Sequence, residues 1–236
     1  MQRLTSFIRV LVVLWLGLWP IGPSSAADAD LTTPEGAAAA FLDGLARQDF
    51  DKVLSTTHGR PMSESFDFVA YVEWNRSQSS ITPAPSGDPF FAAINRAVLA
   101  GHVAYDVKKF IYGLMAEEAV EGRPVAMDAA GAAEFMDVVQ AKRLAGLKLV
   151  KIGIPKLIVS DRVRFQTVAA RLARAQGADD WTERLALLSF EGQHFTTGFS
   201  MLRYGDGWYI SGLQSSVSLI TRIEKSSPDE FDDMVN

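Results

Sequence analysis

The chain has 236 residues, with 23 Lys and Arg against 28 Asp and Glu, and it has no cysteine. The lack of cysteine excludes disulfides, thiolate metal sites and a thiol nucleophile. The acidic balance, without a long basic run, argues against nucleic acid and anionic lipid headgroups as partners, because both need clustered Lys and Arg.

The first 27 residues have the layout of a secretory signal peptide. Arg3 and Arg9 form a positive start, an uncharged apolar run follows from Val10 to Ile21, and small side chains close the segment from Ser24 to Ala27. The run is shorter than the ~20 apolar residues of a membrane-spanning helix. We therefore expect an exported protein, periplasmic or secreted. Its processed chain would be one domain over residues 28–236, without a stable membrane anchor.

The first part of that domain, residues 28–145, is predicted to be mainly helical. Thr32 and Glu35 have the spacing of a capping box at the start of an apolar helix. The Asp49-Phe50-Asp51 corner leads into a second, short helix, and the segment from His58 to Pro61 is predicted to end it, since glycine and proline both terminate helices.

Phe66 to Trp74 fits a strand or a helix, and we favour a helix because its neighbours are helical. A polar, proline-bearing loop from Ser77 to Asp88 precedes a long helix from Pro89 to about Glu117. Gly101 lies where two apolar stripes of that helix meet, which predicts a kink or break there. Asp128 is predicted to cap a further helix, with inward residues Ala132, Phe135, Met136 and Val139.

From Leu147 onward the apolar period changes toward two, so residues 146–215 are predicted to be mainly antiparallel strands. Leu147 to Ile154 is the first candidate strand. The segment around Val163, Phe165 and Thr167 alternates in the same way. Ala169 to Ala175 fits a helix or a strand.

Three consecutive strands follow, over Leu185 to Phe190, Phe195 to Tyr204 and Trp208 to Leu213. Glu191-Gly192 and Asp206-Gly207 are the predicted turns between them. The middle strand carries large side chains on one face and small ones on the other, as in a sheet covered by helices. Residues 216–236 are expected to form a tail or a short acidic helix. The fold class is α+β, with N-terminal helices packed on an antiparallel sheet.

Two segments resemble the nuclear transport factor two-like superfamily, which includes the ketosteroid isomerases: the helical opening from Thr32 to Thr57 and the closing strands from Phe195 to Leu213. The resemblance implies a curved, cone-like sheet that closes a pocket beneath the helices. Because this fold hosts enzymes, ligand carriers and adaptors, it does not select a function. The ending from Gly207 to Arg222 also resembles that of exported phospholipid-shuttle proteins, which implies lipid cargo.

The residue types that carry catalysis are scattered. His58, His102 and His194 are too far apart for a short metal-binding motif. His102 and Asp106 have i, i+4 spacing, which suits an acid–base pair or an exposed pair on a helix surface, and we favour the second because no third group is assigned. The sequence has no nucleophile elbow, no Ser-x-x-Lys motif and no glycine-rich phosphate loop, and it indicates no cofactor or metal site.

Aromatic side chains are the remaining candidates for a site. Most should form the core, and the alternative is that some line a cavity for an apolar ligand. The pocket candidates are Trp74, His102, Tyr105, Phe199 and Trp208. We predict an exported, non-catalytic binding or accessory domain that holds a small apolar ligand or lipid, or contacts an envelope protein. The alternatives are an isomerase, dehydratase or hydrolase-like enzyme with a pocket carboxylate, and an adaptor for a protein partner.

Overall fold

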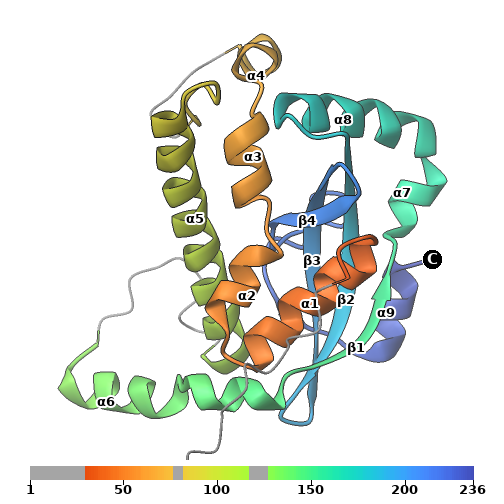
Figure 1. Ribbon diagram of the computed structural model, residues 1–236. Helices are drawn as coiled ribbons and strands as arrows, with labels where there is room; N and C mark the ends of the chain where they lie inside the picture. The colour runs from red at the N-terminus through yellow and green to blue at the C-terminus, as the bar shows by residue number, and fades with distance from the viewer. Residues whose placement is uncertain (1–29, 77–81, 117–126) are drawn as a thin grey trace, which may run out of the picture.

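The computed structural model describes residues 30–76, 82–116 and 127–236. The predicted signal peptide and residues 77–81 of the predicted loop lie outside the described residues. Helices precede an antiparallel sheet in the chain and pack on it (Figure 1), which confirms the α+β class.

The helical first half is as predicted in its main elements. Aspartate side chains accept a backbone N–H at the start of four of these helices, with Asp49, Asp67, Asp88 and Asp128 as the N-caps. The long helix runs through Gly101 as continuous α-helix, so the predicted break there is wrong. The elements are α1 (Pro34–Ala46), α2 (Phe50–Ser55), α3 (Gly59–Ser65), α4 (Phe68–Asn75), α5 (Pro89–Met115), α6 (Ala129–Val138) and the 3₁₀ helix η2 (Ala141–Gly146).

Two details of the N-terminal helices differ from prediction. The N-cap of α1 is Thr33, whose side chain accepts the N–H of Gly36 at 3.0 Å, and not Thr32. With Thr33 as the N-cap, Glu35 is one residue short of the capping-box position, and its carboxylate pairs with Arg184 at 2.5 Å. Gly59 begins α3 with Pro61 in its first turn, where the sequence predicted only a helix end.

The sheet has the order β1-β2-β3-β4, with every pair antiparallel, and β5 pairs with the other half of β3. The β2–β3 turn is at Glu191 and Gly192, as predicted, and both have positive φ (49° and 80°). The next turn is at Gly205 and Asp206, one residue earlier than predicted. The strands are β1 (Lys148–Gly153), β2 (Asp180–Phe190), β3 (Gln193–Tyr204), β4 (Gly207–Gly212) and β5 (Glu224–Lys225).

Two helices interrupt the stretch that was predicted to be mainly strands. α7 (Lys156–Ser160) and α8 (Arg162–Ala175) lie between β1 and β2, so the strand predicted from the alternation around Val163 is wrong. The same segment also has helical spacing, since Phe165, Ala169 and Leu172 recur on one side. That side packs on Trp181 and Leu202 of the sheet, which selects the helix.

Each face of the sheet has its own apolar core. On one face Phe199 is fully buried against Phe41 of α1, with ring centroids 5.9 Å apart, and such burial is worth about 2 kcal/mol per side chain. On the other face, α9 (Pro228–Met234) buries Phe231 against Leu185 and Leu187. A capping box between Ser227 and Glu230 begins α9, so the helical alternative for the chain end is confirmed.

α6 does not pack as predicted. Met136 was expected to face inward but is 72% exposed, and α6 has no buried residue. The helix extends away from the sheet (Figure 1), and the ring of Phe135 contacts Tyr112 of α5 at 5.3 Å. The helical spacing of apolar residues predicted that one side of α6 is buried, and no element of the described fold covers that side.

The edge of β2 is only partly covered by β1. β1 pairs with residues 185–189 of β2, and the first half of the strand extends beyond it. There the guanidinium of Arg184 donates to the carbonyl oxygen of Glu183 at 2.8 Å and to Thr182 Oγ1 at 2.9 Å. The side chain of Arg184 thus forms a hydrogen bond with a backbone carbonyl oxygen of its own strand.

Gly198 in β3 lies directly beneath a crossing segment. A Cβ at this position would lie 2.2 Å from the backbone nitrogen of Ser215, so Gly198→Ala forces that segment to move. We expect Gly198→Ala to lower the free energy of unfolding by about 2 kcal/mol, measured by urea denaturation. Gly146→Ala is the control, because a Cβ there meets nothing within 4 Å. Equal stability of the two variants would contradict this account.

Candidate functional site

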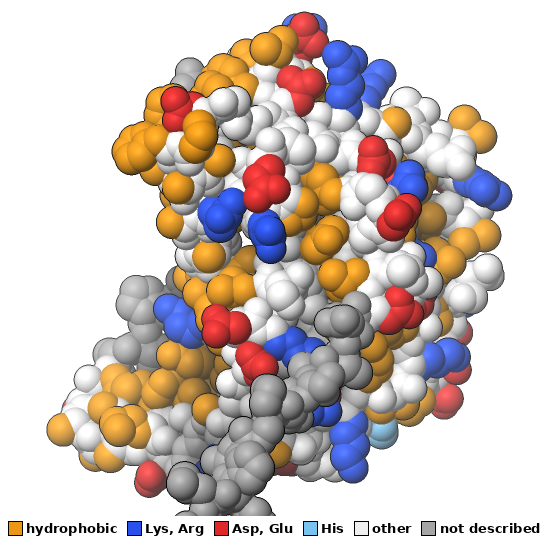
Figure 2. Space-filling model, viewed as in Figure 1, with side chains coloured by type: hydrophobic (Ala, Val, Ile, Leu, Met, Phe, Trp, Pro, Cys, Tyr) orange, Lys and Arg blue, Asp and Glu red, His pale blue; other side chains and the backbone are white. Residues whose placement is uncertain are grey.

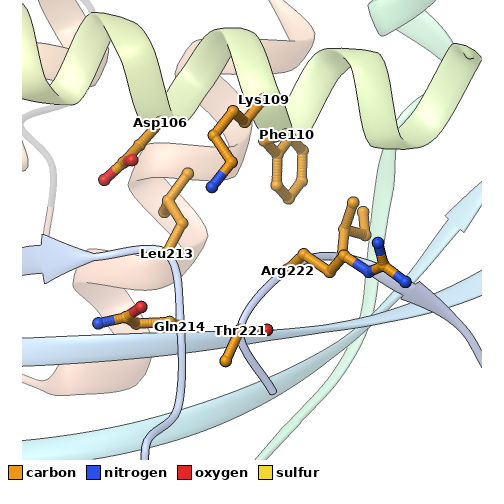
Figure 3. Close-up of a pocket in the computed structure, with 8 residues that line it drawn as sticks. Asp106, Lys109, Phe110, Leu213, Gln214, Thr221 and Arg222 are labelled. Carbon is orange, nitrogen blue, oxygen red and sulfur yellow. The ribbon is translucent and has the colours of Figure 1, made fainter. Parts of the chain in front are cut away.

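A cleft lies between α5 and the chain that leaves β4 and returns to β5. Its cavity has a volume of about 50 Å³. Figure 3 shows α5 along one side and the two passes of the 213–223 segment along the other. The lining residues are Asp106, Lys109, Phe110, Leu213, Gln214, Thr221, Arg222 and Ile223.

A second cavity, of about 10 Å³, adjoins the first. Both are lined by Asp106 and Leu213, so these two side chains form the partition between them. The second cavity is mainly apolar and reaches α1 and β4. Its lining residues are Phe41, Thr57, Val103, Asp106, Val107, Ile210, Ser211, Gly212 and Leu213.

The charged groups of the cleft are separated in space. The Lys109 ammonium extends from α5 toward Leu213, and Arg222 lies across the cavity from Asp106 (Figure 3). Asp106 is half-buried, and burial raises the pKa of its carboxyl, although the charges of Lys109 and His102 act in the opposite direction. The cleft therefore combines a carboxyl that is costly to ionise with an ammonium group that points into the cavity.

His58 lies at the same side of the molecule and is buried. Both its backbone N–H and its Nδ1 lie within hydrogen-bond distance of the Ile210 carbonyl oxygen, at 3.0 and 3.1 Å. Burial and, to a smaller extent, the nearby charge of His102 lower the pKa of His58 to about 4. The imidazole is thus neutral near pH 7, and it ties the start of α3 to β4.

Glu183 holds the 213–223 segment in place from the far face of the sheet. Its carboxylate is fully buried and accepts hydrogen bonds from Ser215 Oγ at 2.5 Å and from the N–H groups of Ser216 and Val217 at 3.0 and 3.1 Å. Burial raises the pKa of this carboxyl, and the hydrogen bonds partly offset the effect. Gly198 leaves the space that the segment needs.

The five residues proposed from the sequence do not come together. Trp74 and Tyr105 are 45% and 56% exposed, and His102 is exposed on α5. Phe199 is in the core, and half-buried Trp208 lines a groove beside α8. None of them lines the cavity of Figure 3.

The residues that do line the cleft carried only a partial signal in the sequence. Asp106 was noted for its spacing from His102, yet among the described residues no ion pair joins the two. Glu183 was missed, although strand alternation places it on the same side as Trp181 and Leu185. A carboxylate at an inward strand position was the available signal.

Within 30–76, 82–116 and 127–236, no group of three or more His, Asp or Glu side chains is arranged to hold a metal ion. No helix in these ranges combines the length and apolar character that crossing a bilayer requires.

Removing the Glu183 carboxylate should release the segment that it holds. Glu183→Ala leaves the buried hydroxyl of Ser215 and two backbone N–H groups without their acceptor. We expect a loss of about 3 kcal/mol in the free energy of unfolding, measured by urea denaturation. Glu134→Ala, on the exposed side of α6, is the control for loss of a carboxylate. A loss no larger than that of the control would show that Glu183 does not anchor the segment.

The raised pKa of Asp106 predicts the direction in which the stability of the chain changes with pH. Its folded carboxyl keeps the proton to a higher pH than the unfolded one, so ionisation costs stability as pH rises above the ordinary value of 3.8. Asp106→Asn removes this cost. The variant should therefore gain stability relative to the unchanged chain between pH 3.5 and pH 7, as followed by urea denaturation at each pH. A constant difference across that range would refute the assignment, and Asp137→Asn on α6 controls for general charge effects.

Comparison with known proteins adds fold information alone. No family model matches the chain, and no curated protein matches it. The structure is similar to a solved structure of a cystatin-like protein from Ruminococcus gnavus, with a TM-score of 0.56 and 17% sequence identity. The match covers 82% of this chain and 44% of that one, so the chain spans less than half the length of its structural neighbour.

Proposed function

We propose that this chain is an exported, non-catalytic binding or accessory domain that takes a small apolar or amphiphilic molecule into the cleft between α5 and β4. The observation that carries the proposal is the pair of adjoining cavities partitioned by Asp106 and Leu213. Phe41, Val103 and Ile210 suit the apolar part of a ligand, and Lys109 suits an acidic head group.

The size of the cavities limits how such a ligand enters. Volumes of about 50 and 10 Å³ are well below the roughly 300–1,000 Å³ of ligand pockets. Uptake of a lipid chain therefore requires that α5 moves away from β4. Val107 and Phe110 hold α5 against the sheet by apolar packing. The side chains of Asn95 and Arg96 form hydrogen bonds with Ala84 and Glu64, which are not part of the sheet.

Two sequence features support the same proposal. The leader-like first 27 residues favour export, to a periplasm or beyond a cell. The resemblance to the nuclear transport factor two-like superfamily places the expected pocket between the helices and the sheet, which is where this cleft lies. The structural similarity to a cystatin-like protein concerns the fold alone and says nothing of a ligand.

Native mass spectrometry tests the proposal most directly. The full chain is expressed in a bacterium with its leader intact, recovered from the periplasm without detergent, and measured under non-denaturing conditions. A periplasmic species that lacks the leader and carries a lipid-mass adduct supports export and binding together. A cytosolic chain that retains the leader contradicts export. An adduct-free mass with no uptake of added fatty acid contradicts ligand binding.

Joining the two cavities should strengthen binding. Leu213→Ala removes part of the partition, so we expect the affinity for the apolar probe N-phenyl-1-naphthylamine to rise about fivefold, measured by fluorescence titration. Leu149→Ala is the matched control, because both leucines are half-buried and pack on the same core. Equal affinities in the two variants, or binding by neither, would contradict a ligand site in the cleft.

Acid–base catalysis is the second candidate function, and Asp106 is the observation that favours it. A half-buried carboxyl with a raised pKa that lines a cleft is a candidate general base. Tyr105, the neighbouring tyrosine, is exposed and lies under the ammonium groups of Lys108 and Lys109. A co-purified molecule that is recovered unchanged supports binding. One that is converted by the unchanged chain and not by Asp106→Asn supports an enzyme.

A further inference from the structure

The outer face of α5 is apolar and open to solvent. Large side chains recur there over four turns, at 41–70% exposure, and they gather on the side of the molecule where α5 lies (Figures 1 and 2). We define this α5 outer face by Phe90, Phe91, Ile94, Val98 and Tyr105.

The opposite side of the same helix is also apolar, with Leu99, Val107 and Phe110 buried in the cores. Arg96 is the single Lys, Arg, Asp or Glu among residues 89–105, which also include His102, and it pairs with Glu64 of α3 at 3.0 Å. A helix that is apolar on all sides is normally covered on all sides, and an exposed apolar patch of this extent marks an interaction surface.

Small residues beside the α5 outer face permit another helix to approach closely. Ala93, Ala97, Gly101 and Ala104 are all exposed, and a Cβ at Gly101 would meet nothing within 4 Å. The face therefore presents a ridge of large side chains next to a shallow strip of small ones. A second helix can therefore approach this side of α5 closely.

Two residue pairs of α5 are symmetrical about Val98, whereas the positions of Ile94 and Phe90 correspond to those of His102 and Asp106. Phe91 and Tyr105 lie seven residues to either side of it, and Asp88 and Lys108 lie ten residues to either side. In an antiparallel pair of α5 helices related by a two-fold axis at Val98, each Phe91 meets Tyr105 of the second copy. Each Asp88 is then level with Lys108 of the second copy, so the charges at the two ends are complementary.

From these observations we propose that the α5 outer face is a homodimer interface, on which a second copy of this chain packs antiparallel with Val98 near the two-fold axis. α6 bounds the face at its end, where Phe135 covers Tyr112. The exposed parts of the five large side chains amount to roughly 500 Å² per copy, and specific interfaces begin near about 1,000 Å² in total. We therefore expect a reversible dimer with a dissociation constant on the order of micromolar.

The absence of cysteine makes a single-cysteine test clean. Val98→Cys would place two thiols near the proposed axis, so mild oxidation should yield a covalent dimer on a non-reducing gel about tenfold faster than for Val163→Cys. Val163 lies on α8 at 78% exposure and is the matched control for an exposed valine on a helix. Equal rates for the two variants would overturn the proposed geometry.

A charge at the axis tests the association itself. Sedimentation equilibrium of the unchanged full chain should show a concentration-dependent dimer. Val98→Glu should be monomeric because two carboxylates would meet at the axis, whereas Val163→Glu should still dimerise. Circular dichroism confirms that both variants are folded.

Two outcomes overturn the proposal without bearing on the ligand cleft. One is a chain that stays monomeric up to about a hundred times the expected dissociation constant. The other is a monomer that binds phosphatidylcholine vesicles in a way that Val98→Glu abolishes, which would identify a lipid surface as the occupant of the face. A homodimer without any bound lipid would instead support this inference while contradicting the proposed function.

Discussion

The buried carboxylate of Glu183 is the constraint on which the candidate site depends. It lies in the first half of β2 and accepts three hydrogen bonds from consecutive residues, beginning at Ser215. Those bonds draw the chain over the far face of β3, and Gly198 lets the backbone pass closely. Ionised carboxylates are rarely buried unless several donors meet them, so the segment and Glu183 require each other.

The position of the 213–223 segment in turn determines the cleft. Leu213 and Ile223 line the cleft together with Phe110 of α5. His58 fixes the neighbouring edge by its two contacts with the Ile210 carbonyl oxygen. The wall of the cleft that belongs to the sheet is therefore held by directional hydrogen bonds, whereas the wall that belongs to α5 is held by apolar packing. Such a difference makes the helix the side that yields when a ligand enters.

Local physical chemistry was enough to predict much of the fold from the sequence. A proline in the first turn predicted where α5 begins, because that signal acts within one helical turn. The large and small faces of β3 were also predicted, since strand alternation alone sets them. The first part of α8 was predicted as a strand, and Ala169 to Ala175 was left open as a helix or a strand, because these residues fit two periods and packing against Trp181 selects between them.

The candidate site was less predictable for a different reason. Asp106 and Leu213 are far apart in the chain, and only the path of the 213–223 segment brings them together. That path depends on Glu183, which resembles an ordinary polar residue in a strand until its burial is known. The five aromatic and histidine candidates were chosen by residue type, and residue type does not indicate which face of a helix is covered. Trp74 and Phe199 show both extremes, since one is exposed and the other is in the core.

Arg184 has a consequence for how this chain behaves at high concentration. The first half of β2 extends beyond β1, and a free strand edge is a template for pairing with another chain. By donating to the carbonyl of Glu183, the guanidinium takes an acceptor that an incoming strand would use, and it adds a charge and a bulky side chain at that edge. Its bond to Glu35 fixes the guanidinium there from the start of α1. Arg184 thus leaves one acceptor fewer at this edge for pairing with a second chain.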